Sequence, residues 1–172
     1  MADATALSIG PDVLTTEAQP PEKRDGSASS FQIQDMIIRD ADSGLIMWKA
    51  GSSFLQPSGL PGNAWQLTAT LPSAILSARS ISRELTFSTV SAITHLHVIQ
   101  DVLVYKTPVE QWSADFGFVI PNSVNSWSHS VDAADSEDML PVEVLSGNTM
   151  IETKFMDGET TLAALSVRLF YK

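Results

Sequence analysis

Residues 81–87 read ISRELTF, so that larger side chains at the odd positions alternate with polar ones at the even positions. Residues 65–71 (WQLTATL) show the same period of two. Successive side chains of a β-strand point to opposite faces, and this alternation is therefore typical of a strand with one face on a core. Neither stretch has the 3.6-residue period of an amphipathic helix. These two segments indicate a protein built from strands.

Outward from these segments, residues 31–172 divide into short apolar and β-branched runs separated by turn residues. The turn sequence at 40–44 (DADSG) predicts a hairpin between runs 31–38 and 45–48, because Asp and Gly favour tight turns. Further strands are expected at 95–105, 109–120, 124–131, 151–155 and 162–171. About nine regularly spaced strands predict an all-β sandwich, with at most a short helical turn near 73–76 or 89–93.

The chain has 172 residues, enough for one domain with a substantial core. Residues 1–30 contain no aromatic residue and are rich in Pro, Ser and charged residues. Such a segment buries too little apolar surface to offset its ordering entropy, so we expect a disordered or loosely attached tail. The folded domain is then residues 31–172. Within it, three glycines and two prolines at 50–63 predict a long loop.

The formal net charge is −10, and the sequence has no cysteine. The charge disfavours nucleic-acid binding and adsorption to acidic membranes, because both need basic patches. The lack of cysteine excludes disulfides, thiol catalysis and cysteine-ligated zinc. No apolar run approaches the ~18 residues of a membrane span, so a soluble cytoplasmic protein is expected. Residues 107–153 contain eight acidic residues and no Lys or Arg, which predicts a solvated acidic face.

No constellation in the sequence predicts an enzyme, a cofactor or a metal site. His95 and His97 would share one face of a strand, but the only other histidine is His129, so packing and surface hydrogen bonds explain the pair. The 40–44 turn lacks the acidic spacing and closing glutamate of a calcium loop. No serine lies in a Gly-x-Ser-x-Gly turn, and no glycine-rich phosphate loop is present.

One long motif and four collinear blocks carry a family resemblance. The motif is residues 112–127 (WSADFGFVIPNSVNSW), and the blocks are 39–48 (RDADSGLIMW), 82–88 (SRELTFS), 145–155 (LSGNTMIETKF) and 167–171 (VRLFY). Together they resemble the delta subunit of retinal rod cyclic-GMP phosphodiesterase, the prenyl-binding protein delta family. The resemblance covers residues 31–172.

This resemblance implies an immunoglobulin-like β-sandwich whose two sheets enclose an apolar lipid tunnel. The tunnel would hold the farnesyl or geranylgeranyl group of a prenylated protein. By position, the lining would be Met36, Ile38, Trp48, Ile75, Ile81, Leu85, Trp112, Val131, Met139, Leu140, Leu145, Ile151, Val167, Leu169 and Tyr171. Arg83 and Gln100 match positions near the cargo's prenylated cysteine and backbone, and Glu110 matches a position at the pocket mouth.

The partners implied by the resemblance are prenylated small GTPases and other prenylated proteins. A GTP-loaded Arf-like GTPase would release the cargo by adding a strand at residues 125–133. The protein would act as a monomer in the cytoplasm, with cilia or vesicles as further locations. The acidic stretch predicts a preference for cargo with a basic segment before its prenylated cysteine.

Two other functions remain open at this point. The first is a myristoyl-binding carrier like the related uncoordinated-119 proteins. The second is a regulatory subunit of a cyclic-nucleotide phosphodiesterase. The sequence departs from the family in the long 50–63 loop and at residues 73–78, where serine and alanine replace a lysine-rich stretch. These departures affect cargo preference and membrane approach more than the pocket.

Overall fold

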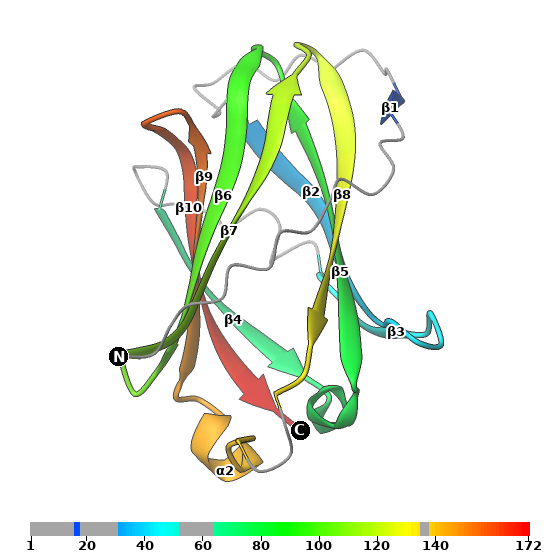
Figure 1. Ribbon diagram of the computed structural model, residues 1–172, viewed down its shortest axis with the longest axis vertical. Coiled ribbons are helices and arrows are strands. Elements are labelled where there is room, and N and C mark those ends of the chain that lie inside the picture. Colours follow the sequence, from blue (N-terminus) through cyan, green and yellow to red (C-terminus); the bar gives the residue numbers. More distant parts are fainter. Residues whose placement is uncertain (1–15, 18–30, 52–63, 135–137) are drawn as a thin grey trace.

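The computed structural model describes residues 16–17, 31–51, 64–134 and 138–172. Two five-stranded sheets face each other in a sandwich (Figure 1). The predicted tail, except for residues 16–17, and most of the predicted 50–63 loop lie outside the described residues. The strands are β1 (Thr16–Glu17), β2 (Phe31–Asp40), β3 (Ile46–Lys49), β4 (Ala64–Leu71), β5 (Ser80–Thr89), β6 (Ile93–Val104), β7 (Thr107–Val119), β8 (Ser123–Asp132), β9 (Thr149–Asp157) and β10 (Thr160–Tyr171).

The first sheet has the order β1-β8-β5-β2-β3, and the second has the order β4-β10-β9-β6-β7. The nine predicted strands coincide with β2 to β10, which confirms the all-β sandwich. Every described pair of neighbouring strands is antiparallel except β4 and β10, which run parallel. The short helical turn predicted at 73–76 is present as the 3-10 helix η1 (Ser73–Ser77). The alternative at 89–93 is wrong, because Thr89 ends β5, Ile93 begins β6 and residues 90–92 form the non-helical connection between them.

The only α-helix of the described residues is α2 (Val142–Leu145), which lies at the same end of the sandwich as η1 (Figure 1). Its four residues are too few to show a helical period in the sequence. In the described part of the chain, no helix has the length and apolar character needed to cross a membrane.

The predicted hairpin between β2 and β3 is present, and Asp40 stabilises its turn. The carboxylate of Asp40 accepts hydrogen bonds from the backbone N–H and the hydroxyl of Ser43, both at 2.7 Å. These bonds lower the pKa of Asp40. Gly44 adopts φ = 72°, a left-handed conformation that glycine reaches without a Cβ clash. The DADSG sequence is therefore a turn and does not have the geometry of a calcium loop.

The centre of the sandwich is an aromatic cluster that joins the two sheets. Phe31 contacts Phe87 and Phe155, with ring centroids 5.2 and 5.0 Å apart, and Phe87 contacts Phe116 at 5.3 Å. Phe31 and Phe87 are each only 1% exposed. Because β2 and β5 belong to one sheet and β7 and β9 to the other, this cluster sets the spacing of the sheets on one side of the functional cavity.

Candidate functional site

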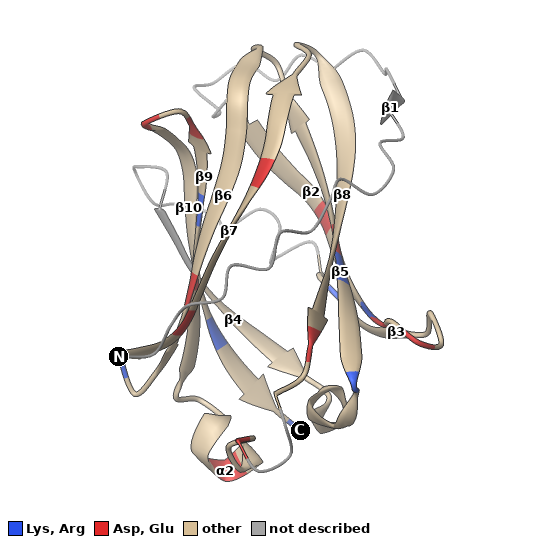
Figure 2. Cartoon of the chain, in the orientation of Figure 1, with Lys and Arg blue, Asp and Glu red and all other residues tan. Residues whose placement is uncertain are grey.

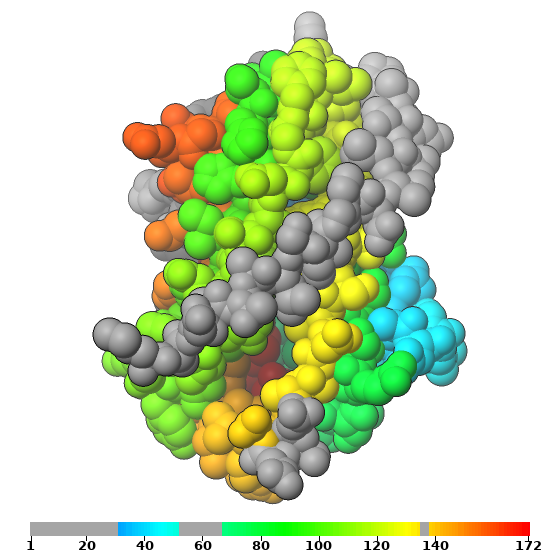
Figure 3. All heavy atoms as spheres, viewed as in Figure 1, coloured from blue at the N-terminus to red at the C-terminus, as the bar shows by residue number. Residues whose placement is uncertain are grey.

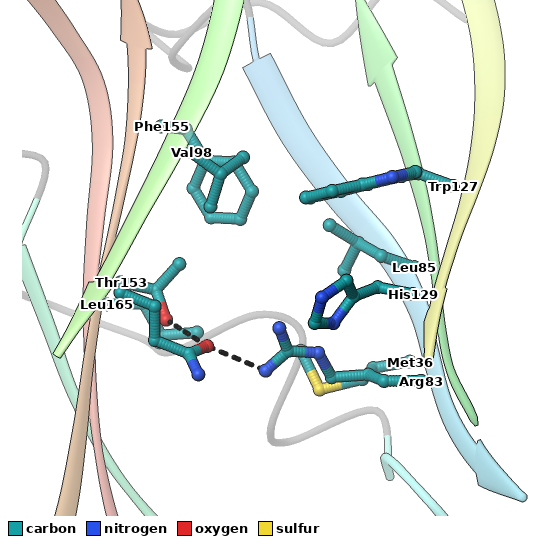
Figure 4. Close-up of a pocket in the computed structure, with 10 residues that line it drawn as sticks. Met36, Arg83, Leu85, Val98, Trp127, His129, Thr153, Phe155 and Leu165 are labelled. Carbon is teal, nitrogen blue, oxygen red and sulfur yellow. Dashed lines mark hydrogen bonds between the residues drawn. The ribbon is translucent and has the colours of Figure 1, made fainter. Parts of the chain in front are cut away.

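A narrow cavity of about 30 Å³ lies between the two sheets, next to the aromatic cluster (Figure 4). Its wall combines apolar, aromatic and polar side chains from both sheets: Met36, Arg83, Leu85, Val98, Gln100, Trp127, His129, Thr153, Phe155 and Leu165. The lipid tunnel expected from the family resemblance corresponds, among the described residues, to a cavity of this small volume.

A line of hydrogen bonds crosses this cavity and links the two sheets. Arg83 Nη1 on β5 donates to Gln100 Oε1 on β6 at 2.6 Å, and Thr153 Oγ1 on β9 donates to the same oxygen at 3.2 Å. Figure 4 shows the Arg83 side chain reaching across from its own sheet toward the opposite one. Gln100 and Thr153 are buried. The amide oxygen of Gln100 thus has two donors, one from each side of the sandwich.

The strand period explains why these polar groups face inward. On β5, Arg83 lies on the same face as Leu85 and Phe87, and on β6 Gln100 lies on the same face as the buried Val98. The sequence therefore directs a guanidinium into an interior that is otherwise apolar. A buried polar group without a partner destabilises the fold, so its presence here requires either protein or ligand acceptors.

Arg83 has more hydrogen-bonding capacity than the described residues satisfy. Its guanidinium carries five N–H donors, and within the described residues its side chain donates one hydrogen bond, to Gln100. The guanidinium also lies over the Trp112 ring, 5.1 Å from its centroid. Burial lowers the pKa of Arg83 to about 10, an effect that the negative charge of Glu110 partly opposes. Arg83 therefore remains cationic at neutral pH, with donors available to a ligand's oxygen atoms.

Beside Arg83, the cavity wall holds a stack of aromatic rings around His129, which pairs directly with Arg83 across β5 and β8. The His129 ring stacks on Trp112 at 4.5 Å between centroids, and Trp127 lies 6.2 Å from both rings. Burial, with a contribution from the charge of Arg83, lowers the pKa of His129 to about 4. His129 is consequently neutral at neutral pH. Its Nδ1 atom is buried and has no hydrogen-bond partner among the described residues.

This geometry consists of a largely apolar cavity with one cationic donor group, Arg83. The family model of the GMP-PDE delta subunit matches residues 26–171 of the chain. The chain belongs to the GMP-PDE delta-subunit family. The resemblance stated from the sequence motifs is thereby confirmed over nearly the whole described part. The delta-subunit family is a prenyl-binding and solubilising family and not a catalytic one.

Four of the residues predicted from the delta-subunit resemblance line the cavity: Met36, Leu85, Arg83 and Gln100. Nine more belong to the surrounding hydrophobic core or pack against it: Ile38, Ile75, Val167, Leu169, Trp48, Ile81, Trp112, Ile151 and Tyr171. Val131 and Leu145 are partly buried at other places, and Glu110 is exposed on β7. Met139 and Leu140 line a separate surface groove beside η1.

Six cavity residues were not among the predicted site residues: Val98, Trp127, His129, Thr153, Phe155 and Leu165. A signal for two of them exists in the sequence, because Trp127, His129 and Val131 occupy alternate positions of one strand. Trp127 and His129 therefore face the same side as the predicted Val131. The other four are indistinguishable in sequence from ordinary core positions.

The sandwich of this delta-subunit family member is hollowed on the side between β7 and β8. In Figure 3, atoms of the C-terminal strand β10 are visible deep between the surfaces of β7, β8 and α2. The elements that border this hollow carry acidic residues in Figure 2; Asp132 ends β8, and Glu143 lies in the first turn of α2. The acidic stretch recognised in the sequence thus lies partly at this opening.

Proposed function

We propose that this protein is a carrier that binds the farnesyl or geranylgeranyl group of small GTPases and other prenylated proteins and keeps them soluble. The observation that carries the proposal is Arg83, a cation with spare donors inside an apolar sandwich of the delta-subunit family. A prenylated C-terminus combines a hydrocarbon chain with nearby carbonyl oxygens. The cavity offers apolar wall to the chain, and Arg83 offers donors to the oxygens.

The energetics of a lipid chain suit a carrier. Burying about fifteen carbons contributes on the order of 10 kcal/mol before ordering costs, at about 0.8 kcal/mol per CH₂. The lipid chain must separate cavity side chains that are in contact in this structure, and the flexible Met36 is suited to such adjustment. The net binding free energy is the gain from burying the lipid less the cost of separating these side chains.

Cargo release would follow from strand addition by a GTP-loaded Arf-like GTPase at β8. One edge of β8 pairs with β5 along its whole length, from Ser123 to Asp132. Among the described residues, its other edge pairs only with β1, at Val124 and Asn125. The remaining backbone groups of that edge, which no other described strand pairs with, are the ones to which an added strand would bind. A tenfold loss of cargo affinity needs only about 1.4 kcal/mol of differential binding between two states.

The test is a titration with a fluorescent peptide that is farnesylated and methyl-esterified at its C-terminal cysteine. We expect saturable binding that a myristoylated peptide does not displace at equal concentration. Trp112→Ala should weaken binding at least tenfold, because Trp112 contacts both Arg83 and His129. Phe118→Ala is the matched control, since Phe118 lies on the same strand and is exposed. Absence of saturable binding, or equal effects of the two variants, would overturn the proposal.

The release step has its own experiment. An Arf-like GTPase locked in the GTP form should accelerate peptide dissociation, and the GDP form should not. Ser128→Pro removes a backbone N–H from β8 and serves as an edge-disrupting variant. An unchanged dissociation rate with the GTP form would refute strand-driven release while leaving the proposal of lipid binding intact.

The same proposal includes the state and location of the carrier. The protein would act as a monomer in the cytoplasm, with cilia or vesicles as further locations.

Basic cargo is the last part of the proposal. Asp132 and Glu143 beside the hollow would attract a polybasic segment upstream of the lipidated cysteine. Binding of such a peptide should weaken as the salt concentration rises, whereas binding of a neutral peptide should not. Equal salt dependence for the two peptides would contradict this preference.

A further inference from the structure

The outer face of the second sheet, opposite the cavity, carries three metal-ligating side chains in one cluster. His95 and His97 project from β6, and Asp115 projects from the neighbouring edge strand β7. One candidate ligand atom from each of the three lies within 4.8 Å of the other two. The sequence pointed to His129 as the only other histidine, but His129 lines the cavity. The third group of the cluster is instead a carboxylate contributed by the neighbouring strand.

The regular pairing of β6 with β7 creates this cluster. His97 pairs with Asp115 in the same continuous register that pairs Val98 with Ala114 and the residues that follow. Directly opposed residues of an antiparallel pair lie on the same face of the sheet. His95 lies two residues before His97 on β6, and its imidazole joins the other two groups. The strand register therefore places the carboxylate beside the imidazoles.

The contacts within the cluster show a site that is partly assembled. His95 Nε2 and Asp115 Oδ1 are 3.0 Å apart, and the His95 and His97 ring centroids are 5.9 Å apart. The backbone N–H of His95 donates to Asp157 Oδ1 on β9 at 2.8 Å, which fixes this part of β6. The Nδ1 atom of His97 is buried and has no hydrogen-bond partner among the described residues. This ring thus has a nitrogen whose bonding capacity the described residues leave unused.

We propose that His95, His97 and Asp115 form a binding site for a divalent transition-metal ion, with Zn²⁺ as the representative ligand. Zinc binds imidazole nitrogen and carboxylate oxygen at about 2.0–2.2 Å, which places tetrahedral ligand atoms roughly 3.3 Å apart. The His95–Asp115 pair, at 3.0 Å, is close to this separation, and rotation of the exposed His95 and Asp115 side chains can adjust the distances within the cluster. Imidazole and carboxylate ligands favour zinc and its neighbours over calcium and magnesium.

A metal at this place would link the edge strand β7 to β6 and would not obstruct the cavity. Three protein ligands leave at least one coordination position for water or for a side chain of a partner. Because the ion binds the folded arrangement of two strands, binding stabilises the native state in proportion to the logarithm of ion concentration over Kd. Zn²⁺ should therefore raise the melting temperature of the protein without lowering its affinity for a lipid peptide.

The experiment is isothermal titration of the full chain, free of affinity tags, with ZnCl₂ alone, followed by melting curves with and without the ion. We expect one equivalent of Zn²⁺ to bind and the melting temperature to rise. His97→Asn and Asp115→Asn should each weaken binding at least tenfold. His129→Asn and Asp101→Asn are the controls, because His129 faces the cavity and Asp101 lies on β6 beside Gln111, away from the cluster.

Circular dichroism of each variant shows whether it is folded. We expect the variants at Asp115 and His95 to fold, because both side chains are exposed. Should His97→Asn prove unfolded, His95→Asn replaces it in the comparison. Absence of saturable Zn²⁺ binding would overturn the proposal. Zinc uptake of equal affinity in the cluster variants and in the controls would overturn it as well, because such binding would be non-specific surface adsorption.

Discussion

Replacing Arg83 by methionine should separate the contribution of this residue to ligand binding from its contribution to stability. Methionine keeps an unbranched side chain in the cavity and removes the charge. Gln100 Oε1 loses the 2.6 Å hydrogen bond from Arg83 but keeps the one from Thr153 Oγ1 at 3.2 Å. No buried acceptor is then left without a donor. We therefore expect the free energy of unfolding to stay within about 1 kcal/mol of the wild-type value or to rise, because a desolvated cation is removed.

The same substitution should strongly weaken binding of a farnesylated, methyl-esterified peptide. Hydrogen bonds that involve a charged group contribute about 1.5–3 kcal/mol each. Loss of one such bond to a cargo oxygen corresponds to a roughly 10- to 150-fold increase in Kd. Fluorescence titration measures this change, and urea denaturation of the same sample measures stability.

Gln100→Leu is the informative counterpart. It leaves the guanidinium of Arg83 in the cavity without its acceptor, and an uncompensated buried charge destabilises by about 3 kcal/mol. Arg79→Met is the neutral control, since Arg79 is exposed and pairs with Asp42 at 3.1 Å on the surface. The reasoning is refuted if Arg83→Met destabilises the protein as much as Gln100→Leu does, or if Arg83→Met leaves peptide affinity unchanged.

Three further predictions concern stability and are measured by urea denaturation. His129 has a pKa of about 4 in the fold, below the ~6.5 of an unfolded chain, so the unfolded state binds more protons between these values and stability falls as the pH falls from about 6.5 to 4. His129→Asn should remove this part of the acid sensitivity, and an unchanged pH profile would contradict the assignment. Phe87→Ala should reduce the free energy of unfolding by about 3–5 kcal/mol, since Phe87 is buried and packs against the rings of Phe31 and Phe116. A change below about 1 kcal/mol would show that the neighbouring side chains collapse into the space left by the ring. Gly147→Ala should destabilise by about 1–2 kcal/mol, because Gly147 has φ = 77° and a Cβ would lie 2.9 Å from the Phe170 ring; equal stability would mean that the ring moves aside without strain.

Much of the fold follows from local sequence patterns. The period-two runs at 65–71 and 81–87 became β4 and β5, and the DADSG turn became the β2–β3 connection. The parallel pairing of β4 with β10 could not be predicted in this way, because about 100 residues separate the two strands and neither carries a local sign of its partner. The helix α2 escaped prediction for a different reason, since four residues do not complete a recognisable pattern.

The candidate site was predictable only in part. Arg83 and Gln100 were assigned through the family resemblance, and the structure brings them into direct contact. The residues that complete the cavity, such as Val98 and Phe155, read as ordinary core because a cavity wall and a dry core require the same side chains. The cluster on the outer face depends on the pairing register of β6 with β7, and the register of two strands has no signature in either strand alone.

The small volume of the cavity has a consequence for the choice of lipid. The side chains around this small cavity are in contact with one another before a lipid binds, so each carbon of the lipid that enters must push them apart. Each additional carbon therefore gains free energy by being buried and loses free energy by displacing the side chains of the cavity wall. Affinity should therefore rise with chain length only while the walls yield easily, and then level off. Selection among lipids would depend on the stiffness of the sandwich as well as on the hydrophobicity of the chain. Substitutions far from the lipid that loosen the contact between the sheets would then shift the preference toward longer chains.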